Sequence, residues 1–202
     1  HPLNPNGRAG DEPTWVTTPS LAIAYEMGLE AEVIEAWTWP DKARLLEPWY
    51  ERIRDARALL ITQSQRDEQA SMALGALKAV YTRTIGMMGS STHLRGQEGY
   101  APERRHMIIG RANANILRRV RQIGETTGRW PLAIQTDTLL YSSDEEDPAK
   151  AWPLAQDPEA KQWWGSGLGE YKHEATGLLA DQLEYLTGGR WEGKDALLGR
   201  ER

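Results

Sequence analysis

Apolar and polar positions follow a helical period in three long segments of the chain. Apolar residues recur at spacings of three to four over residues 43–63, 67–85 and 103–126, which predicts three amphipathic helices. A shorter helix is predicted over residues 19–28. Thr18 offers a hydroxyl cap directly before a proline, and proline is favoured at the first helical position.

Other segments have the signals of strands and turns. Trp15–Thr17 and Ala31–Trp39 are predicted to be strands, the second because acidic and apolar residues alternate along it. Residues 132–143 carry two apolar runs around a polar centre, which predicts a β-hairpin with Asp137 at or near its turn. Residues 1–13 are rich in Pro, Gly and Asn and are predicted to be a flexible segment. The pattern as a whole predicts an α+β fold.

Composition restricts the class of protein. The 202 residues are 40% hydrophobic and 26% charged, which is typical of a globular chain. No apolar run approaches the roughly 20 residues needed to span a bilayer, so we expect no membrane association. There is no cysteine, which excludes disulfides and thiolate metal sites and favours a cytoplasmic location. Because residue 1 is His rather than Met, we expect a fragment of a longer protein.

Charge is unevenly distributed along the chain. The net charge is −5, which by itself disfavours nucleic-acid binding. However, seven arginines and a single acid, Glu125, lie between Arg104 and Arg129, and a run of four acids occupies residues 144–147. A surface on which charges are segregated can hold DNA even when the total charge is negative.

Three features occur in an order that resembles the family B DNA polymerases. Residues 78–86 read KAVYTRTIG, similar to the K-x-x-x-N-S-x-Y-G of the fingers helix in that family. An arginine-rich helix over residues 104–121 follows, and then Gln-Thr-Asp-Thr at residues 135–138, similar to the D-T-D-S hairpin of the palm. Residues 168–174 resemble an L-G-x-W/Y-x-x-E element of the protein-primed branch, and the similarity covers roughly residues 14–178. Residues 15–20 read WVTTPS and residues 83–87 read RTIGM, and with these phrases the chain also resembles the C-terminal region of bacterial telomere-associated proteins.

The resemblance implies a palm-like sheet with a reduced helical fingers hairpin. The sheet would consist of Trp15–Thr17, Ala31–Trp39 and the hairpin at residues 132–143. The implied segments are a flexible N-terminus (1–13), a first palm segment (14–40), a fingers-like hairpin and loop (41–100), a second palm segment (101–150) and a thumb-like C-terminus (151–202).

The resemblance also implies functional residues. Asp137 takes the place of a catalytic aspartate that binds a metal ion, and two-metal nucleotidyl transfer uses such carboxylates. Lys78 and Thr82 take positions near the incoming nucleotide. The residues expected to contact DNA are Arg83, Arg111, Arg118, Arg119, Arg121 and Lys172. Mg²⁺ is implied only if an aspartate upstream of residue 1 completes the pair.

Departures from the family pattern weaken the expectation of catalysis. Gln135 stands where the family has the first acid of D-T-D, and Ile85 stands where it has a tyrosine that packs near the nascent base pair. One carboxylate is too few to bind two metal ions. The resemblance therefore implies a polymerase-like module with a degenerate active site.

Three functions remain open from the sequence. The first is a cytoplasmic, nucleoid-associated module in replication of linear DNA that binds single-stranded or hairpin DNA ends, or a terminal protein. The second is a portion of an active protein-primed DNA polymerase whose first catalytic aspartate lies upstream. The third is a non-catalytic adaptor between proteins, which would show no affinity for DNA.

Overall fold

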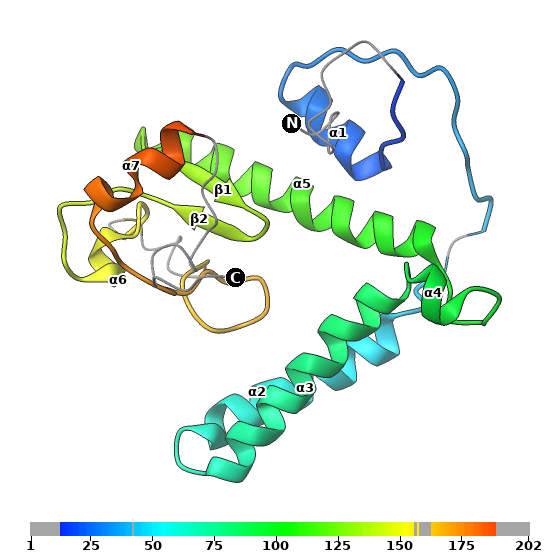
Figure 1. Ribbon diagram of the computed structural model, residues 1–202, viewed down its shortest axis with the longest axis horizontal. Coiled ribbons are helices and arrows are strands. Elements are labelled where there is room, and N and C mark those ends of the chain that lie inside the picture. Colours follow the sequence, from blue (N-terminus) through cyan, green and yellow to red (C-terminus); the bar gives the residue numbers. More distant parts are fainter. Residues whose placement is uncertain (1–12, 42, 156, 158–162, 189–202) are drawn as a thin grey trace. The chain divides into compact units, whose positions relative to one another are not determined.

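The computed structural model describes residues 13–41, 43–155, 157 and 163–188. Within these residues the chain combines helices with a two-stranded antiparallel sheet, which is an α+β arrangement (Figure 1). The chain divides into two compact units, and the boundary falls between Gly110 and Arg111, inside helix α5 (Pro102–Thr127). No helix in the described ranges is long and apolar enough to cross a membrane.

The predicted helix near the start of unit 1 is confirmed. Helix α1 (Thr18–Glu26) carries a proline in its first turn, where the missing N–H costs nothing. Its N-cap is Thr17 rather than Thr18, and the Thr17 hydroxyl lies 3.0 Å from the Ser20 hydroxyl. The helix ends just before Gly28, which adopts a φ of +76° that glycine tolerates best.

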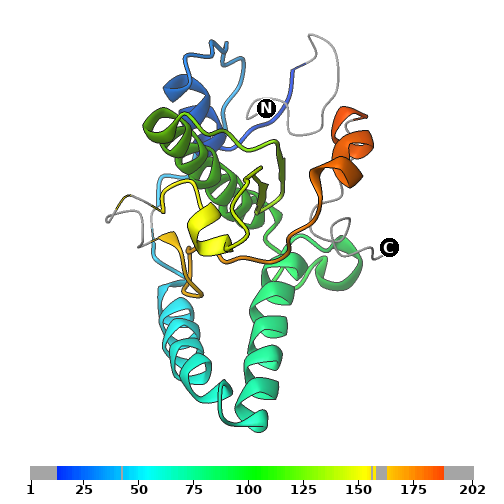
Figure 2. The ribbon, with the colours of Figure 1, turned by 90° about the vertical axis from the view of Figure 1, so that its left-hand side faces the viewer.

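A helical hairpin follows in the same unit and confirms two further predicted helices. Helices α2 (Glu47–Ser64) and α3 (Glu68–Met87) pack along each other and run antiparallel (Figure 1). Asp67 caps α3, because its carboxylate accepts a hydrogen bond of 2.9 Å from the Gln69 backbone N–H. Figure 2 shows that the two helices diverge away from their connecting turn.

The two strands predicted in unit 1 are wrong. Trp15–Thr17 and Ala31–Trp39 form no strand. A strand needs a hydrogen-bonded neighbour, and within the described residues no backbone pairs with these segments in a ladder. Side chains hold them instead, through an edge-to-face contact of Trp15 with Trp37 at 5.7 Å and a 3.3 Å hydrogen bond from the Tyr25 hydroxyl to the Ala31 carbonyl. The predicted palm-like sheet is therefore reduced to the hairpin.

The connection between α3 and α5 is tied at both ends. It contains a short helix, α4 (Ser91–Leu94). The Ala101 backbone N–H donates a 2.9 Å hydrogen bond to the Met88 carbonyl and closes this connection. In the portion of α5 that belongs to unit 1, Gly110 is buried against the side chain of Thr17, the N-cap of α1. A Cβ atom at this position would clash with Thr17, so the close approach requires glycine.

Unit 2 contains the remainder of α5 and the small two-stranded sheet. Its other elements are β1 (Ala133–Gln135), β2 (Thr138–Leu140), α6 (Pro148–Ala151) and α7 (Leu179–Thr187). Ile134 pairs with Leu139 at the centre of the ladder, and residues 136–137 form the turn, so the predicted hairpin is confirmed. The chain reverses after α5 at Gly128, with a φ of +70°, and Trp130 packs directly on Gly124.

The five-segment division implied by the family resemblance stays a prediction. The observed boundary at residues 110 and 111 cuts through the second palm segment, residues 101–150. Most of the flexible N-terminal segment, residues 1–12, lies outside the described residues, as does residue range 189–202 of the thumb-like segment.

Candidate functional site

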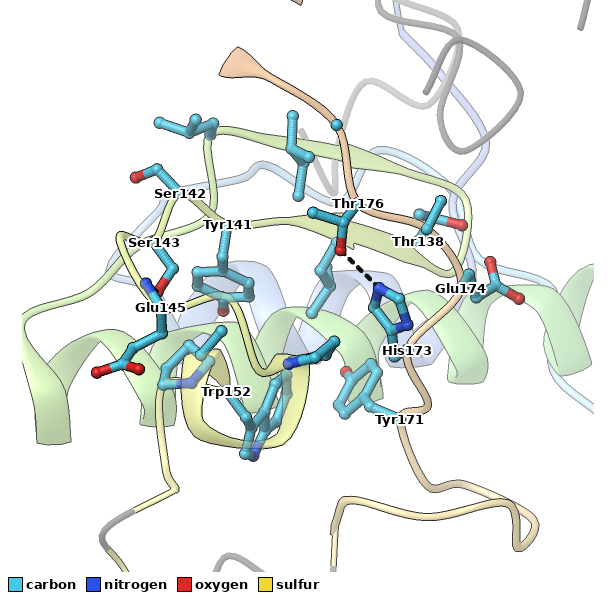
Figure 3. A pocket seen from close by; sticks show the side chains of 18 of the residues that line it. Thr138, Tyr141, Ser142, Ser143, Glu145, Trp152, Tyr171, His173, Glu174 and Thr176 are labelled. Atoms are coloured by element: carbon cyan, nitrogen blue, oxygen red, sulfur yellow. Dashed lines mark hydrogen bonds between the residues drawn. The ribbon is translucent and has the colours of Figure 1, made fainter. Parts of the chain in front are cut away.

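Unit 2 contains a groove between its hairpin and the C-terminal segments. The groove encloses about 860 Å³ and is lined by β2, by the loop that leads to α6, and by residues 170–179. Figure 3 shows aromatic rings of Tyr141, Trp152 and Tyr171 at its centre, and His173 beside them. His173 Nε2 lies 2.8 Å from the Thr176 hydroxyl, so this histidine is held within its own segment.

The groove rests on the core of unit 2. Ile123 of α5, Trp152 and Leu154 are the fully or nearly fully buried residues of this core. Trp152 stands at its centre, with ring centroids 5.4 Å from both Trp164 and Tyr171, and it meets Tyr141 edge to face at 6.1 Å. Aromatic pairs at these separations stabilise beyond the area they bury, so the cluster ties three distant segments together.

Arg119 of α5 belongs to this packing. Its guanidinium lies 5.3 Å from the centroid of the Trp163 ring and 5.6 Å from that of Tyr171. It also donates a hydrogen bond to the Gly169 carbonyl, fifty residues along the chain. Arg119, predicted to contact DNA, is therefore engaged inside unit 2 in this structure, as expected for a guanidinium that stacks on aromatic faces.

Arg129 is a second arginine used internally. Its two terminal nitrogens donate to the carbonyls of Ala151, at 3.1 Å, and Ser142, at 2.8 Å. These bonds connect the end of α5 to α6 and to the strand end of β2. Arg129 lines the groove, but its guanidinium is used to connect Ala151 and Ser142, which belong to the same groove wall region of unit 2.

Asp137 lies where the sequence predicted, at the tip of the hairpin, and is exposed. It lines the groove, and its negative charge contributes to raising the pKa of Tyr171. The preceding Thr136 has a φ of +51°, which is strained for a β-branched residue. Strain of this kind is concentrated at functional sites, and the sequence showed no sign of it. Among the described residues, no group of three or more His, Asp or Glu side chains could hold a metal ion.

Burial raises the pKa of both tyrosines in the aromatic cluster. The pKa of Tyr141 is raised to about 12, mainly by burial, and the Tyr141 hydroxyl has no hydrogen-bond partner among the described residues. Burial also raises the pKa of Tyr171, while the positive charge of Arg119 opposes this effect. Both side chains are therefore neutral phenols near pH 7.

The raised pKa of Tyr141 predicts a loss of stability in alkali. The unfolded phenol ionises near pH 10, whereas the folded one resists until pH about 12. The folded state then holds the proton more tightly, so stability is complete below pH 10 and falls as the pH rises towards 12. We expect the free energy of unfolding, measured with urea, to fall by about 1–2 kcal/mol over this pH range, after allowance for partial solvation of the side chain. Tyr141→Phe should reduce the loss, and Tyr185→Phe, at an exposed site, should leave it unchanged.

One face of α5 in unit 2 carries two of the six predicted DNA contacts, Arg111 and Arg118. Arg111, Asn115, Arg118 and Gln122 recur at helical spacing, so they share one side of the helix. Arg111, Asn115 and Gln122 are exposed, and an Arg118 nitrogen lies 3.4 Å from the Asn115 side-chain oxygen. We call these four residues the α5 polar face. Arg121 pairs with Glu125 at 2.6 Å, so some of its charge is neutralised.

Helix α3 carries the predicted nucleotide-binding residues of unit 1. Lys78 and Thr82 are four residues apart and exposed, and Arg83 is exposed beside them. No acidic residue occurs from Gln69 through Gln97. Lys78, Thr82 and Arg83 belong to unit 1, whereas Asp137 belongs to unit 2.

Lys172 lies in a different environment from the other predicted DNA contacts. It lines the groove, and its ammonium group is 3.9 Å from a carboxylate oxygen of Glu174. Lys172, which was predicted to contact DNA, therefore lies in the groove beside a carboxylate.

The positive charge of the chain is concentrated in its middle. Residues 69–121 contain nine Lys or Arg and two acids, a net charge of +7, whereas the rest of the chain carries −12, which together give −5. The segment includes α3 except for its first residue, Glu68, and it includes three of the four residues of the α5 polar face. A segregated distribution of this size is typical of chains that bind polyanions locally.

Comparisons with protein-family models, with curated proteins and with solved structures found no match.

The sequence did not predict that these aromatic side chains form one cluster. Trp163 and Trp164 are partly buried and pack against the core cluster that contains Trp152. The signal that would have found the whole cluster is the density of Trp and Tyr over residues 141–171. This density marks unit 2 as the place where a small core is built from few but large side chains.

Proposed function

We propose that this chain is a DNA-binding module with a polymerase-like, catalytically degenerate architecture that acts at DNA ends in the replication of linear DNA. The observation that carries the proposal is the α5 polar face, whose arginines lie in the segment with a net charge of +7. The ordered resemblance to the fingers helix, the palm helix and the palm hairpin of family B polymerases supports the polymerase-like architecture.

The chemistry of the α5 polar face suits a phosphate backbone. Its arginines neutralise phosphates and can bind them with two parallel hydrogen bonds. Its Asn115 and Gln122 add neutral donors, which position a backbone without reading the bases. Helix α3 of unit 1 carries Lys78 and Arg83 in a stretch of sequence without acids, residues 69–97, and these two residues are a separate candidate contact for phosphate.

The hairpin supports a degenerate active site. Asp137 provides one carboxylate at the turn, while Gln135 occupies the position of the other acid and pairs with Thr138 in the ladder. Two-metal chemistry needs at least two anionic ligands that point to one place. In this proposal Mg²⁺ has no role unless a carboxylate from a segment upstream of residue 1 joins Asp137, and the partners are single-stranded or hairpin DNA and a terminal protein.

Binding to fluorescent single-stranded, hairpin and duplex DNA at two salt concentrations tests the proposal. The variant Arg111→Gln/Arg118→Gln removes two phosphate contacts, so its logarithmic salt slope should fall by about 1.4–1.8 and its affinity in low salt by about tenfold or more. The control Arg52→Gln/Arg66→Gln removes the same charge from sites of unit 1 outside the basic segment and should bind nearly as wild type.

Two results would decide against the proposal. The absence of DNA binding in low salt, or an equal loss in both variants, would favour the adaptor between proteins. Incorporation of nucleotides that is lost in Asp137→Ala would contradict the degenerate site and favour the active polymerase.

A further inference from the structure

The groove of unit 2 is strongly acidic, in contrast to the α5 polar face. Its lining includes six carboxylates (Asp137, Asp144, Glu145, Glu146, Glu170 and Glu174) and two basic residues, Arg129 and Lys172. The net charge of the lining is therefore −4 with His173 neutral. A polyanion is repelled from such a groove, so the surface that binds DNA and this groove require different ligands.

The basic residues of the groove offset little of this charge. Arg129 donates to two backbone carbonyls, and Lys172 is matched by Glu174. One acid is also used internally, because Glu170 accepts a 2.6 Å hydrogen bond from the Gly167 N–H. Asp144, Glu145 and Glu146 are exposed and form no ion pair within the described stretches of the chain. They supply the charge that is available to a ligand.

Aromatic rings lie between these carboxylates. Figure 3 shows Glu145 and Glu174 at opposite ends of the groove, with Tyr141, Trp152 and Tyr171 between them. Trp152 is 8% exposed and lines the groove, and its indole N–H has no hydrogen-bond partner among the described residues. The groove thus combines acids at its rim with a ring system at its centre.

The same aromatic cluster already binds a guanidinium of this chain. Arg119 stacks over Trp163 and Tyr171 but does not line the groove. This contact shows that rings of the cluster accept a flat cation. Arginine combines such stacking with several donors that suit carboxylates, whereas lysine offers a compact point charge.

We propose that the groove of unit 2 docks an extended, arginine-rich segment of a partner protein. Its guanidinium groups would pair with Asp144, Glu145 and Glu146 at the rim and stack on the aromatic rings between them. The occupant is a peptide rather than a metal ion, because in the described residues no three acidic or His side chains form a group that could hold one. The proposal goes beyond DNA binding, since it assigns a second partner to a separate surface.

Titration of the full chain with synthetic peptides of about ten residues, in which Gly alternates with Arg, Lys or Glu, tests this docking site. The groove variant is Asp144→Asn/Glu145→Gln/Glu146→Gln. Its control, Glu30→Gln/Glu32→Gln/Glu35→Gln, removes three exposed charges from unit 1. The groove variant should bind the Arg peptide about tenfold more weakly, because each exposed pair contributes a modest amount. The control should change affinity by less than about twofold.

The chemical shifts of the indole N–H groups in nuclear magnetic resonance spectra give a second readout. Non-specific electrostatic attraction of a peptide should leave the shift of Trp152 unchanged. The Arg peptide is expected to shift the Trp152 resonance, whereas the Lys peptide should bind more weakly and shift it less. Equal losses in the groove variant and the control, equal binding of the Arg and Lys peptides, or an unmoved Trp152 resonance would each overturn the proposal. Arg111 and Arg118 lie outside the groove lining, so failure of DNA binding would leave this result unaffected.

Discussion

Replacement of Trp152 by alanine is expected to lower the free energy of unfolding of unit 2 by about 3–5 kcal/mol. Trp152 is 8% exposed and contacts the rings of Tyr141, Trp164 and Tyr171, so its loss leaves a large cavity at the centre of the core. The loss is a large share of the stability of a domain of this size. Urea unfolding, followed by far-ultraviolet circular dichroism, measures it.

The matched control for Trp152→Ala is Trp39→Ala. Trp39 is 57% exposed and belongs to unit 1, so its removal creates no cavity and should change stability by less than about 1 kcal/mol. If both variants lose similar stability, Trp152 is not the centre of a packed core. Trp152→Phe retains some of the volume and should fall between the two.

Replacement of Arg119 by alanine should destabilise unit 2 by about 2–3 kcal/mol. The change removes the stacking on Trp163 and Tyr171 and the charged hydrogen bond to the Gly169 carbonyl. Residues 163–171 then lose some of their contacts with α5, so their backbone amides should exchange hydrogen faster. Hydrogen exchange with mass spectrometry of this segment, beside urea unfolding, measures both effects.

Two substitutions separate packing by Arg119 from charge. Arg119→Lys retains the charge but loses the flat guanidinium, so it should recover only a minor share of the stability. Arg111→Ala removes an exposed arginine from the same helix and should change stability by about 0.5 kcal/mol or less. Full stability of Arg119→Ala, together with loss of DNA binding, would instead place Arg119 on the DNA-binding surface.

Local sequence signals were sufficient for most of the secondary structure. Helices α1, α2, α3 and α5 were predictable because their signals are contained within each segment: apolar residues at helical spacing, Asp67 as a cap, and a glycine after α1 and after α5. The hairpin was predictable for the same reason, since a polar centre between two apolar runs specifies a turn. These signals also placed Asp137 at the turn.

The strand predictions failed because a strand depends on a neighbour that its own residues do not specify. Ala31–Trp39 contains Val33, Ile34 and two tryptophans, which favour a strand. The propensity had no effect, because no described segment offers its backbone for pairing. The palm-like sheet inferred from the family resemblance therefore has no support beyond the hairpin.

Patterns along the chain were enough to specify the helices, the hairpin turn and the concentration of positive charge over residues 69–121. The role of each charged residue depended on long-range packing. Arg118 and Arg119 are neighbours in the sequence, yet Arg119 turns onto Trp163 and Tyr171 while Arg118 remains on the α5 polar face. Successive residues on a helix point about 100° apart, so the position of distant aromatic side chains selects which arginine packs within unit 2.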